Sequence, residues 1–514
     1  INMAFEVDGA TRLRLMTFFV VALIIYVFGQ RIVRKNLIKV TSNYLCDMRM
    51  NIINKLLNTY FSKMESIEPW KVLVVLNNDT EAISNFINTA ISGFTGAVTL
   101  LFGMLYMGLI NPFGLLIASV VSFAAAVCYI AAAISTNKIW ERARDLQSLF
   151  IKYINDLLDG FKELKLNSAK RKDFHYDVED CSGVYRDKRI EFDFKFANVY
   201  VIGELMFTVV VGVIAFLFPI IFGNISSNSL RSYIFIFFYL LGPLHGILAV
   251  VPNLVQVKAS WQRVKSLTKE ISDLETIPEQ AAPVKGLPGE FTMELKDATF
   301  SYKGENGENF KIGPINLSFK SGEITFLTGG NGSGKSTLAK LITGLYSADE
   351  GEILINGEYI EPERLNELFA AVFSDYHMFE KLYGIDVVKR AGEIDEYLKK
   401  LKINHKLHIN PDKTLSNIWL STGQKKRVAL MVSYLENRPI YLFDEWAADQ
   451  DPQFRRYFYH TLLPELKAQG KCVIAVTHDD RYFETADKVI KLEYGKVVEE
   501  KINKAFTRVG EEVS

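Results

Sequence analysis

The stretch Gly329-Gly330-Asn331-Gly332-Ser333-Gly334-Lys335-Ser336-Thr337 decides the fold of the second half of the chain. It follows an apolar run at residues 324–327, which predicts a buried strand, and leads into a helical pattern at 338–344. A glycine-rich loop between a strand and a helix is a P-loop, whose backbone N–H groups surround phosphate oxygens at a helix N-terminus. In this pattern Lys335 reaches the β- and γ-phosphates, and Ser336 offers its hydroxyl to Mg²⁺. We therefore expect an α/β nucleotide-binding domain here.

A second apolar run, at residues 440–443, ends in Asp444 and Glu445. Phosphoryl transfer needs positioned charge and little covalent chemistry from the protein. One carboxylate at this place can hold Mg²⁺, and the next can activate the attacking water. Two acids after an apolar strand are common, but after a P-loop they indicate an ATPase. We assign Asp444 to the metal, and Glu445 and Lys335 to catalysis.

Composition divides the chain into two parts. Its 514 residues are too many for one compact core, so two or three domains are expected. Hydrophobic residues make up 49% of the chain, and their excess lies almost entirely before residue 258, so the two parts occupy different solvents. The 59 basic and 59 acidic residues cancel and give no indication of nucleic acid as a partner. The cysteines lack the spacing of a zinc site or a disulfide framework: Cys46, Cys128, Cys181 and Cys472.

Uncharged runs in the first half are long enough to cross a membrane. One lies at residues 15–30, and residues 82–137 contain no charged side chain. The second run is too long for one helix and is interrupted by Asn111-Pro112-Phe113-Gly114, so it predicts two spans with a tight turn. Runs at 199–222 and 232–251 bring the expected visible spans to five. The alternative is a large soluble helical core, in which uncharged runs of this length are not expected.

Basic residues gather in the two long segments at 31–81 and 138–195, whereas the short turns carry almost none. By the positive-inside rule these segments and the ATPase half face the cytoplasm. Five spans would leave the N-terminus outside without a signal peptide, so we expect a sixth span upstream of Ile1. Amphipathic pieces at 66–75 and 159–174 either carry motion to the ATPase domain or are simple solvated helices.

Prolines and glycines concentrate in residues 276–290, which predicts a linker. We expect residues 1–275 to form an α-helical transmembrane domain, with its first helix missing, and residues 291–514 to form the α/β P-loop ATPase domain.

Between the P-loop and the acidic pair stands Leu420-Ser421-Thr422-Gly423-Gln424, followed by a helical run at 425–436. With the P-loop, this segment resembles the ABC superfamily, whose LSGGQ signature appears here as LSTGQ. The resemblance implies a helix N-terminus that binds the γ-phosphate of a nucleotide held by the P-loop of a partner subunit. It also implies that Tyr302 stacks on adenine, with core packing as the alternative for this ring, that Asp451 lies in the D-loop, and that His478 contacts the γ-phosphate.

Residues 444–452, Asp-Glu-Trp-Ala-Ala-Asp-Gln-Asp-Pro, and the stretch Thr477-His478-Asp479-Asp480 are similar to bacterial exporters of cyclic peptides and siderophore precursors. These include the exporters of lasso microcins, lipopeptide toxins and pyoverdine precursors. The resemblance implies a homodimer of half-transporters in the bacterial inner membrane, which uses ATP and Mg²⁺ to pump small cyclic or modified peptides outward. A flippase for lipids or lipid-linked precursors is the alternative, and an ATP-gated regulatory membrane protein is a less favoured one.

Two further positions carry expectations about coupling and cargo. The position of the Q-loop glutamine holds Ser374, whose shorter side chain is expected to contact Mg²⁺ weakly, with Asp375 or a bridging water as other routes. Glu204 is a carboxylate within an apolar run. We expect it to face the cargo cavity, or else to pair with a basic or backbone group nearer the cytoplasmic side.

Overall fold

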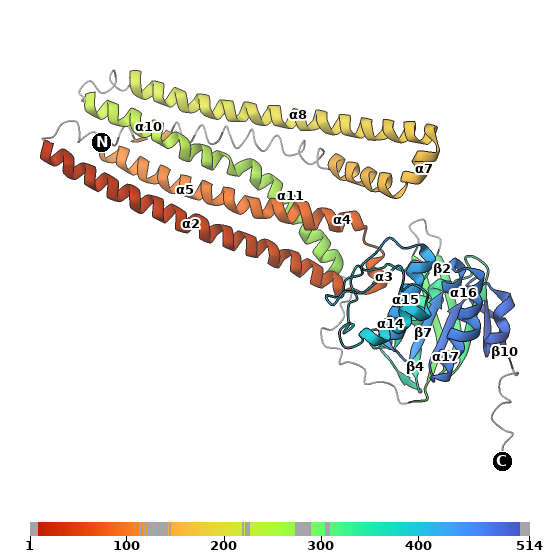
Figure 1. Cartoon of the computed structure of the whole chain (residues 1–514). Helices are drawn as coiled ribbons and strands as arrows, with labels where there is room; N and C mark the ends of the chain where they lie inside the picture. The colour runs from red at the N-terminus through yellow and green to blue at the C-terminus, as the bar shows by residue number, and fades with distance from the viewer. Residues whose placement is uncertain are drawn as a thin grey trace, which may run out of the picture. The chain divides into compact units, whose positions relative to one another are not determined.

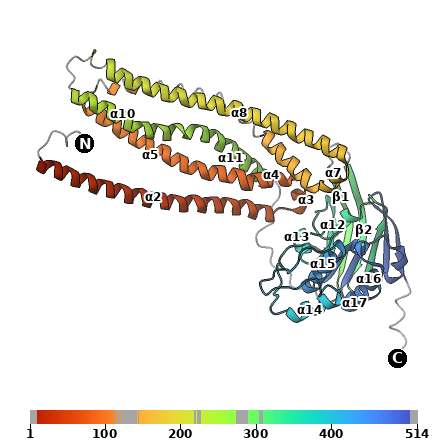
Figure 2. The same cartoon turned by 45° about the horizontal axis from the view of Figure 1, so that its top comes forward.

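The structure, a computed structural model, describes residues 9–110, 145–217, 227–272, 289–303 and 309–503, with isolated positions at 112–142 and at 220. The chain forms two compact units (Figures 1 and 2). The helical unit comprises Ile1–Thr59 and Ser66–Leu274, and the sheet unit comprises Tyr60–Glu65 and Glu275–Ser514. The predicted linker at 276–290 lies almost entirely outside the described residues.

Long helices build the helical unit, with α5 packed against α2, α10 and α11. Figure 1 shows α5 between α2 and α10. Its elements are α2 (Gly9–Leu57), α4 (Pro69–Val74), π-helix η1 (Val75–Asp79), α5 (Thr80–Ile110), α7 (Phe161–Leu166), α8 (Ser168–Gly212), π-helix η2 (Val213–Leu217), α10 (Ser227–Leu248) and α11 (Val250–Ser272).

Two helical stretches among the described residues are long and apolar enough to cross a membrane, judged by length and composition: Leu13–Leu57 and Pro69–Leu109. They contain the predicted run at 15–30 and the first half of the run at 82–137. The second half of that run, with its predicted turn, lies almost entirely outside the described residues. The run at 199–222 continues α8 into η2, and most of the run at 232–251 falls in α10. The number of spans stays a prediction.

A partly buried ion pair ties the helical unit together at the π-helical turn. Asp79 has no exposed surface, and its carboxylate accepts hydrogen bonds from both Nε (2.8 Å) and Nη2 of Arg263 on α11. Nε of Arg49 on α2 donates to the carbonyl of Leu76 (2.9 Å) and to Oγ1 of Thr80 (3.1 Å). A buried charge is stable only with such partners. Three helices are therefore fastened at η1.

The described residues of the sheet unit form two β-sheets. The antiparallel sheet has the order β2-β1-β4-β5, and the larger sheet has the order β10-β9-β3-β8-β7-β6. The antiparallel sheet contains β1 (Thr292–Lys303), β2 (Asn309–Lys320), β4 (Glu350–Ile355) and β5 (Glu358–Tyr359). The larger sheet contains β3 (Ile324–Gly329), β6 (Phe369–Val372), β7 (Ile440–Asp444), β8 (Cys472–Val476), β9 (Lys488–Glu493) and β10 (Lys496–Ile502).

The carboxyl ends of the central strands of the larger sheet lie together at one edge. Strands β3, β8, β7 and β6 are parallel neighbours, so their carboxyl ends meet at the same edge. Residues of β7 and β8 are buried throughout, as continuous apolar strands covered on both faces should be. Alternate residues enter two hydrophobic clusters: Leu442 packs with helix α12, whereas Phe443 packs with helix α15. The helices are α12 (Lys335–Ile342), α13 (Pro362–Asn366), α14 (Ala391–Lys400), α15 (Thr422–Glu436), α16 (Pro452–Tyr457) and α17 (Leu463–Ala468).

A short segment from the first part of the chain also belongs to the sheet unit. Helix α3 (Phe61–Met64) is followed by its C-cap Glu65, whose carboxylate accepts hydrogen bonds from Nζ of Lys340 (2.7 Å) and the hydroxyl of Tyr346 (2.6 Å). The rings of Phe61 and Tyr346 lie 6.1 Å apart. This contact comes from residues directly before the amphipathic piece predicted at 66–75. The other predicted piece, at 159–174, contains α7, in the helical unit.

Candidate nucleotide site

The P-loop connects the end of β3 to the first residue of α12, as its sequence predicts. Gly329 has φ 147°, and a Cβ there would lie 2.3 Å from the carbonyl oxygen of Leu492. Gly334 precedes α12 with φ 99°, in the left-handed region that favours glycine. At these two positions the glycines are required by the backbone. The loop therefore approaches its neighbours more closely than any residue with a side chain would permit.

Lys335 lies in the mouth of this loop. Its buried ammonium donates hydrogen bonds to the carbonyls of Gly329 (3.0 Å) and Gly330 (2.9 Å). Burial lowers the pKa of Lys335, while the carboxylates of Glu445 and Asp444 act in the opposite direction. The hydroxyl of Ser333 is buried and has no hydrogen-bond partner within the described parts of the chain. An unpartnered buried hydroxyl in a glycine loop fits a ligand that supplies acceptor oxygens, as a phosphate does.

Asp444 ends β7 and is only 1% exposed. Burial and the neighbouring Glu445 raise the pKa of this carboxyl, and hydrogen bonds from Ser336 and Ser374 lower it. The three residues predicted for the metal are therefore brought together. Oδ1 of Asp444 is buried without a hydrogen-bond partner in the described chain. An oxygen-only set with one carboxylate suits Mg²⁺, which keeps water and phosphate among its ligands.

Glu445 and His478 meet where β7 and β8 end. Oε1 of Glu445 lies 3.2 Å from Nε2 of His478, and the Glu445 backbone N–H donates to the carbonyl of Val476 (3.1 Å). Glu445 has φ 51°, a left-handed conformation uncommon for residues other than glycine. Both side chains remain partly exposed, so both have access to a ligand at the sheet edge. The pair can therefore orient a water molecule and accept a proton from that water.

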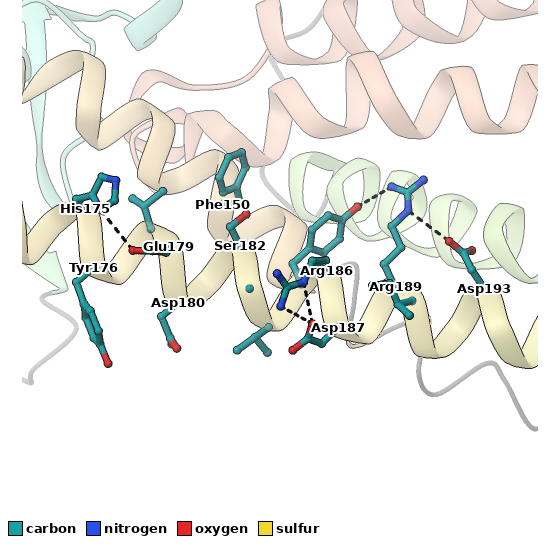
Figure 3. Close-up of a pocket in the computed structure, with 15 residues that line it drawn as sticks. Phe150, His175, Tyr176, Glu179, Asp180, Ser182, Arg186, Asp187, Arg189 and Asp193 are labelled. Atoms are coloured by element: carbon teal, nitrogen blue, oxygen red, sulfur yellow. Dashed lines mark hydrogen bonds and ion pairs between the residues drawn. The ribbon is translucent and has the colours of Figure 1, made fainter.

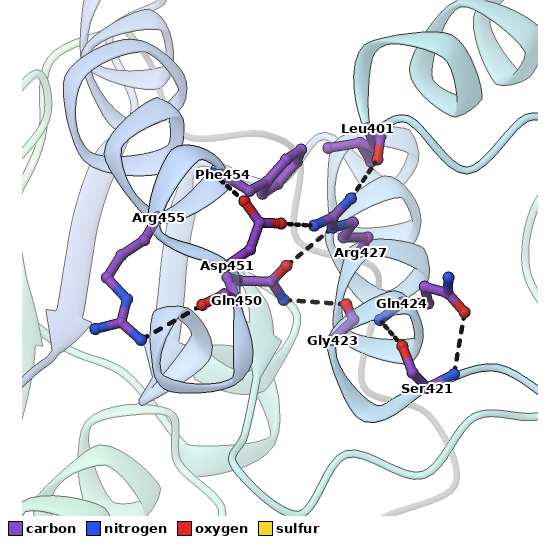
Figure 4. Close-up of polar contacts among 9 residues, drawn as sticks. All are labelled: Leu401, Ser421, Gly423, Gln424, Arg427, Gln450, Asp451, Phe454 and Arg455. Carbon is purple, nitrogen blue, oxygen red and sulfur yellow. Dashed lines mark hydrogen bonds and ion pairs between the residues drawn. The ribbon is translucent and has the colours of Figure 1, made fainter.

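The signature residues Ser421 to Gln424 form the N-cap and the first turn of α15, and Ser421 and Gln424 hydrogen-bond to each other. Ser421 caps the helix: its Oγ accepts from the Gln424 N–H (3.4 Å), and its own N–H donates to Oε1 of Gln424 (3.1 Å), as Figure 4 shows. Ser421 and Thr422 are exposed. A capped, exposed helix N-terminus carries a positive dipole end that attracts anions from outside the chain.

The D-loop, residues 448–451, is fastened to the signature helix (Figure 4). Nε2 of Gln450 donates to the carbonyl of Gly423 (3.0 Å), while Arg427 donates to Oε1 of Gln450 (2.9 Å) and to Asp451 (2.7 Å). Asp451 caps α16 through the N–H of Phe454 (2.9 Å). That N–H and Arg427 hold the pKa of Asp451 below its usual range. The resemblance placed Gln450 in the D-loop, but nothing in the sequence marks Arg427, because a helical arginine without a marked partner is typical of a solvated face.

Comparison with known proteins identifies this arrangement. The family model described as ABC transporter matches residues 312–448. A curated protein of Pseudomonas syringae pv. syringae, "ATP-binding protein SyrD", is 32% identical over 463 residues, which is 88% of this chain and 82% of that protein. The chain belongs to the ABC transporter family. It is a membrane protein whose ATPase is coupled to transport.

Further comparisons concern the fold of the transporter and the range of proteins to which it is similar. The structure of a bacterial Atm1-family ABC exporter with ATP bound superimposes with a TM-score of 0.80 at 17% identity, over 96% of this chain and 89% of that chain. The transporter therefore has the exporter fold. ATP-dependent lipid A-core flippases of Dechloromonas aromatica and Haemophilus influenzae (strain 86-028NP) are 28% and 29% identical to it. Those alignments cover 53% and 49% of this chain and about half of each flippase, 48% and 45%.

Two predicted residues of the transporter are not among the contacts described above. Tyr302 lies in β1 opposite Phe310 of β2, and its side chain falls outside the described residues. Glu204 lies in α8, where its side chain is exposed and its carbonyl accepts from Oγ1 of Thr208 (3.0 Å). Their predicted roles, adenine stacking and cargo contact, stay predictions.

A large groove of about 1100 Å³ lies along α8 of the transporter (Figure 3). Among its charged side chains, His175 lies 3.6 Å from Glu179, and Arg189 contacts Tyr185 and Asp193, all on α8. Such pairs three or four residues apart are typical of a solvated helix face. Glu204 is not among the residues that line this groove.

Proposed function

We propose that this transporter is one half of a homodimer that hydrolyses ATP to export small cyclic or modified peptides across the bacterial inner membrane. One observation supports the proposed dimer. The candidate catalytic and metal-binding residues gather at the sheet edge: Lys335, Asp444, Glu445 and His478. The signature, by contrast, is exposed and capped by its own residues. A signature of this kind needs a nucleotide from another chain. Homodimers with twofold symmetry provide two such composite sites.

The residues of one chain then divide the work on ATP. The P-loop and Lys335 hold the phosphates, and Tyr302 stacks on the adenine. Ser336 and Asp444, with a weaker contribution from Ser374, would hold Mg²⁺, which neutralises phosphate charge when bound. Glu445 accepts the proton of the attacking water, and His478, 3.2 Å from Glu445, keeps that carboxylate and the γ-phosphate in position.

The partner chain completes each site. Its signature N-terminus, with Ser421, Thr422, Gly423 and Gln424, stabilises the γ-phosphate with backbone N–H groups and the helix dipole. Asp451 lies in the D-loop that is tied to this helix through Arg427. A single chain should therefore hydrolyse ATP poorly.

The peptide cargo rests on two lines of support. One is the resemblance of residues 444–452 and 477–480 to exporters of cyclic peptides, and the other is the similarity to SyrD over most of both chains. The basic segments between the spans favour a cytoplasmic ATPase domain and outward transport. In this proposal Glu204 contacts the cargo, and Glu204→Gln is expected to weaken cargo-stimulated hydrolysis.

The deciding experiment measures ATP-dependent uptake of a labelled cyclic or lasso peptide by inside-out vesicles that contain the full-length transporter. We expect uptake by the wild-type protein and its loss in Glu445→Gln. Equal uptake by both proteins would overturn the proposed coupling to hydrolysis.

The flippase relatives favour a second candidate, the transport of lipids or lipid-linked precursors. Absence of peptide uptake together with ATPase activity stimulated by such lipids would favour this function. ATPase activity that responds to neither peptide nor lipid would favour an ATP-gated regulatory role.

A further inference from the structure

Lys426 is a charged residue buried between the signature helix and the catalytic carboxylate residue. Its side chain is 5% exposed, although it lies only two residues after Gln424 in α15. Its ammonium donates to the backbone carbonyl of Glu445 (2.9 Å) and lies 2.7 Å from Oδ2 of Asp449 in the D-loop. A buried ammonium is stable only when partners replace its water. These two contacts supply partners at its buried end.

The backbone of Lys426 is fixed as firmly as its side chain. Nε1 of Trp446, which follows Glu445 in the chain, donates to the carbonyl of Lys426 (2.7 Å). Trp446 is itself buried and stacks on Phe458 at 4.4 Å between ring centroids. The two residues thus exchange contacts in both directions across the helix and the loop after β7. A displacement of α15 is therefore transmitted to the backbone of Glu445.

We propose that Lys426 is a positioning residue that links the signature helix to the catalytic carboxylate of the same chain. The inference rests on the proposed homodimer, in which a chain's signature serves the ATP at its partner's P-loop while its Glu445 serves the ATP at its own. Lys426 then connects the two ATP sites. When ATP occupies the partner's P-loop, it attracts the signature of this chain. Lys426 then positions the backbone of Glu445 of this chain at its own ATP site.

The other contacts of this region favour a rigid connection. Gln450 and Arg427 join the same helix to the D-loop through side chains, and a Cβ at Gly423 would lie 2.6 Å from the carbonyl oxygen of Asp449. Lys426 differs from these residues because it alone among them is bonded to Glu445 within the described contacts. Its exposed neighbour Lys425 provides a matched control on the same helix.

The test uses the full-length dimer and measures the rate of ATP hydrolysis against ATP concentration. For Lys426→Met we expect kcat to fall on the order of 10- to 100-fold with KM within about twofold, because the carboxylate is misplaced while nucleotide binding is kept. We expect the wild-type Hill coefficient for ATP to exceed 1 and that of the variant to fall to about 1. Lys425→Gln should resemble the wild type in all three quantities.

Asp449→Asn is a second test variant. It changes a partly exposed side chain and leaves the buried side chain of Lys426 in place. Asp449 is 43% exposed, and asparagine at this position keeps an acceptor oxygen but removes the negative charge that balances the Lys426 ammonium. We expect the same loss of cooperativity with a smaller fall in kcat. A wild-type Hill coefficient of about 1, or both variants with wild-type cooperativity and kcat, would overturn the inference. Normal hydrolysis by Glu445→Gln would instead overturn the proposed function.

Discussion

The sheet edge and the signature helix form the two halves of the proposed ATP site, and they are built in opposite ways. At the sheet edge, buried Lys335 and Asp444 lie behind the Glu445–His478 pair, and carbonyls and hydroxyls of the same chain surround them. The signature is exposed, and its polar groups are satisfied by its own cap and by the D-loop. In the proposed dimer, one half of the site is assembled within the chain. The exposed signature would then provide the other half, as a surface for the partner chain.

The difference shows where each half obtains its precision. Parallel strands place their ends together, so the sheet edge inherits its geometry from the core. The first turn of the signature helix is exposed or half-buried, and side-chain contacts of Gln450 and Arg427 hold it in place. A change at the sheet edge should therefore affect the chemistry of one chain, whereas a change at the signature should affect the partner.

Complementation between two inactive chains should give the largest effect. Lys335→Ala removes the phosphate contact and Ser421→Arg blocks the signature, so each homodimer should lose activity on the order of 100-fold or more. A mixed dimer keeps one intact site, formed by the P-loop of the Ser421→Arg chain and the signature of the Lys335→Ala chain. Co-purified mixed chains should recover measurable hydrolysis, at most about a quarter of the wild-type rate for independent sites, and less where the blocked signature no longer sets Glu445 through Lys426. No recovery in verified mixed dimers would contradict the division of the site between chains.

His478→Ala should impair only the half of the ATP site that lies at the sheet edge. Removal of the imidazole frees the Glu445 carboxylate, and we expect kcat to fall on the order of 100-fold, the usual loss for one group that stabilises charge. Affinity for a fluorescent ATP analogue should stay within about threefold, because Lys335 and the P-loop are intact. The readouts are phosphate release and equilibrium binding. An equal loss in both would indicate that the histidine serves the fold.

Gly423→Ala should disturb the signature half. The added Cβ meets the backbone carbonyl of Asp449 at 2.6 Å, so the helix and the D-loop must separate. We expect a loss of about 1–3 kcal/mol in the free energy of unfolding and a fall in kcat of roughly 10-fold. Gly392→Ala on α14 is the control, since a Cβ there has open space and should be neutral or slightly stabilising. Equal stability of the two variants would refute the close approach.

Asp444→Asn should give the smallest effect, on stability, in protein free of nucleotide and divalent cations. The pKa of Asp444 is raised in the folded state, so its proton is bound more tightly there, and stability falls as the pH rises through the window above the ordinary aspartate pKa. The neutral asparagine removes this dependence. At neutral pH the variant should be more stable by on the order of 1 kcal/mol. The gain should shrink as the solution is acidified, and a gain independent of pH would contradict the assignment.

The sheet edge could be predicted from the sequence because phosphate chemistry demands particular residues. Gly329, Lys335 and Asp444 are marked by local spacing and by the strands before them. The contacts that hold the signature could not, since Gln450 meets Gly423 across 27 residues and Lys426 is an ordinary basic residue in sequence. Their roles arise from packing between segments that no short pattern joins.

The helical unit was predictable in a coarser way. Absence of charge predicts that a helix enters a membrane, and α2 and α5 meet that criterion. It does not predict which side chains face one another. Asp79 and Arg263 are separated by 184 residues, and nothing near either residue marks the pair. Glu204 illustrates the same limit, because a lone carboxylate in an apolar run indicates a partner without naming it.

The position of α3 has a consequence for any attempt to study the sheet unit by itself. A fragment that begins at residue 291 contains both sheets but lacks Glu65 and Phe61. Tyr346 is 1% exposed in the whole chain, and removal of these two residues would uncover its hydroxyl and leave Lys340 without its carboxylate. The unit is continuous in space but not along the chain. Limited proteolysis between residues 65 and 291 should therefore leave a nicked complex in which the α3 peptide stays bound.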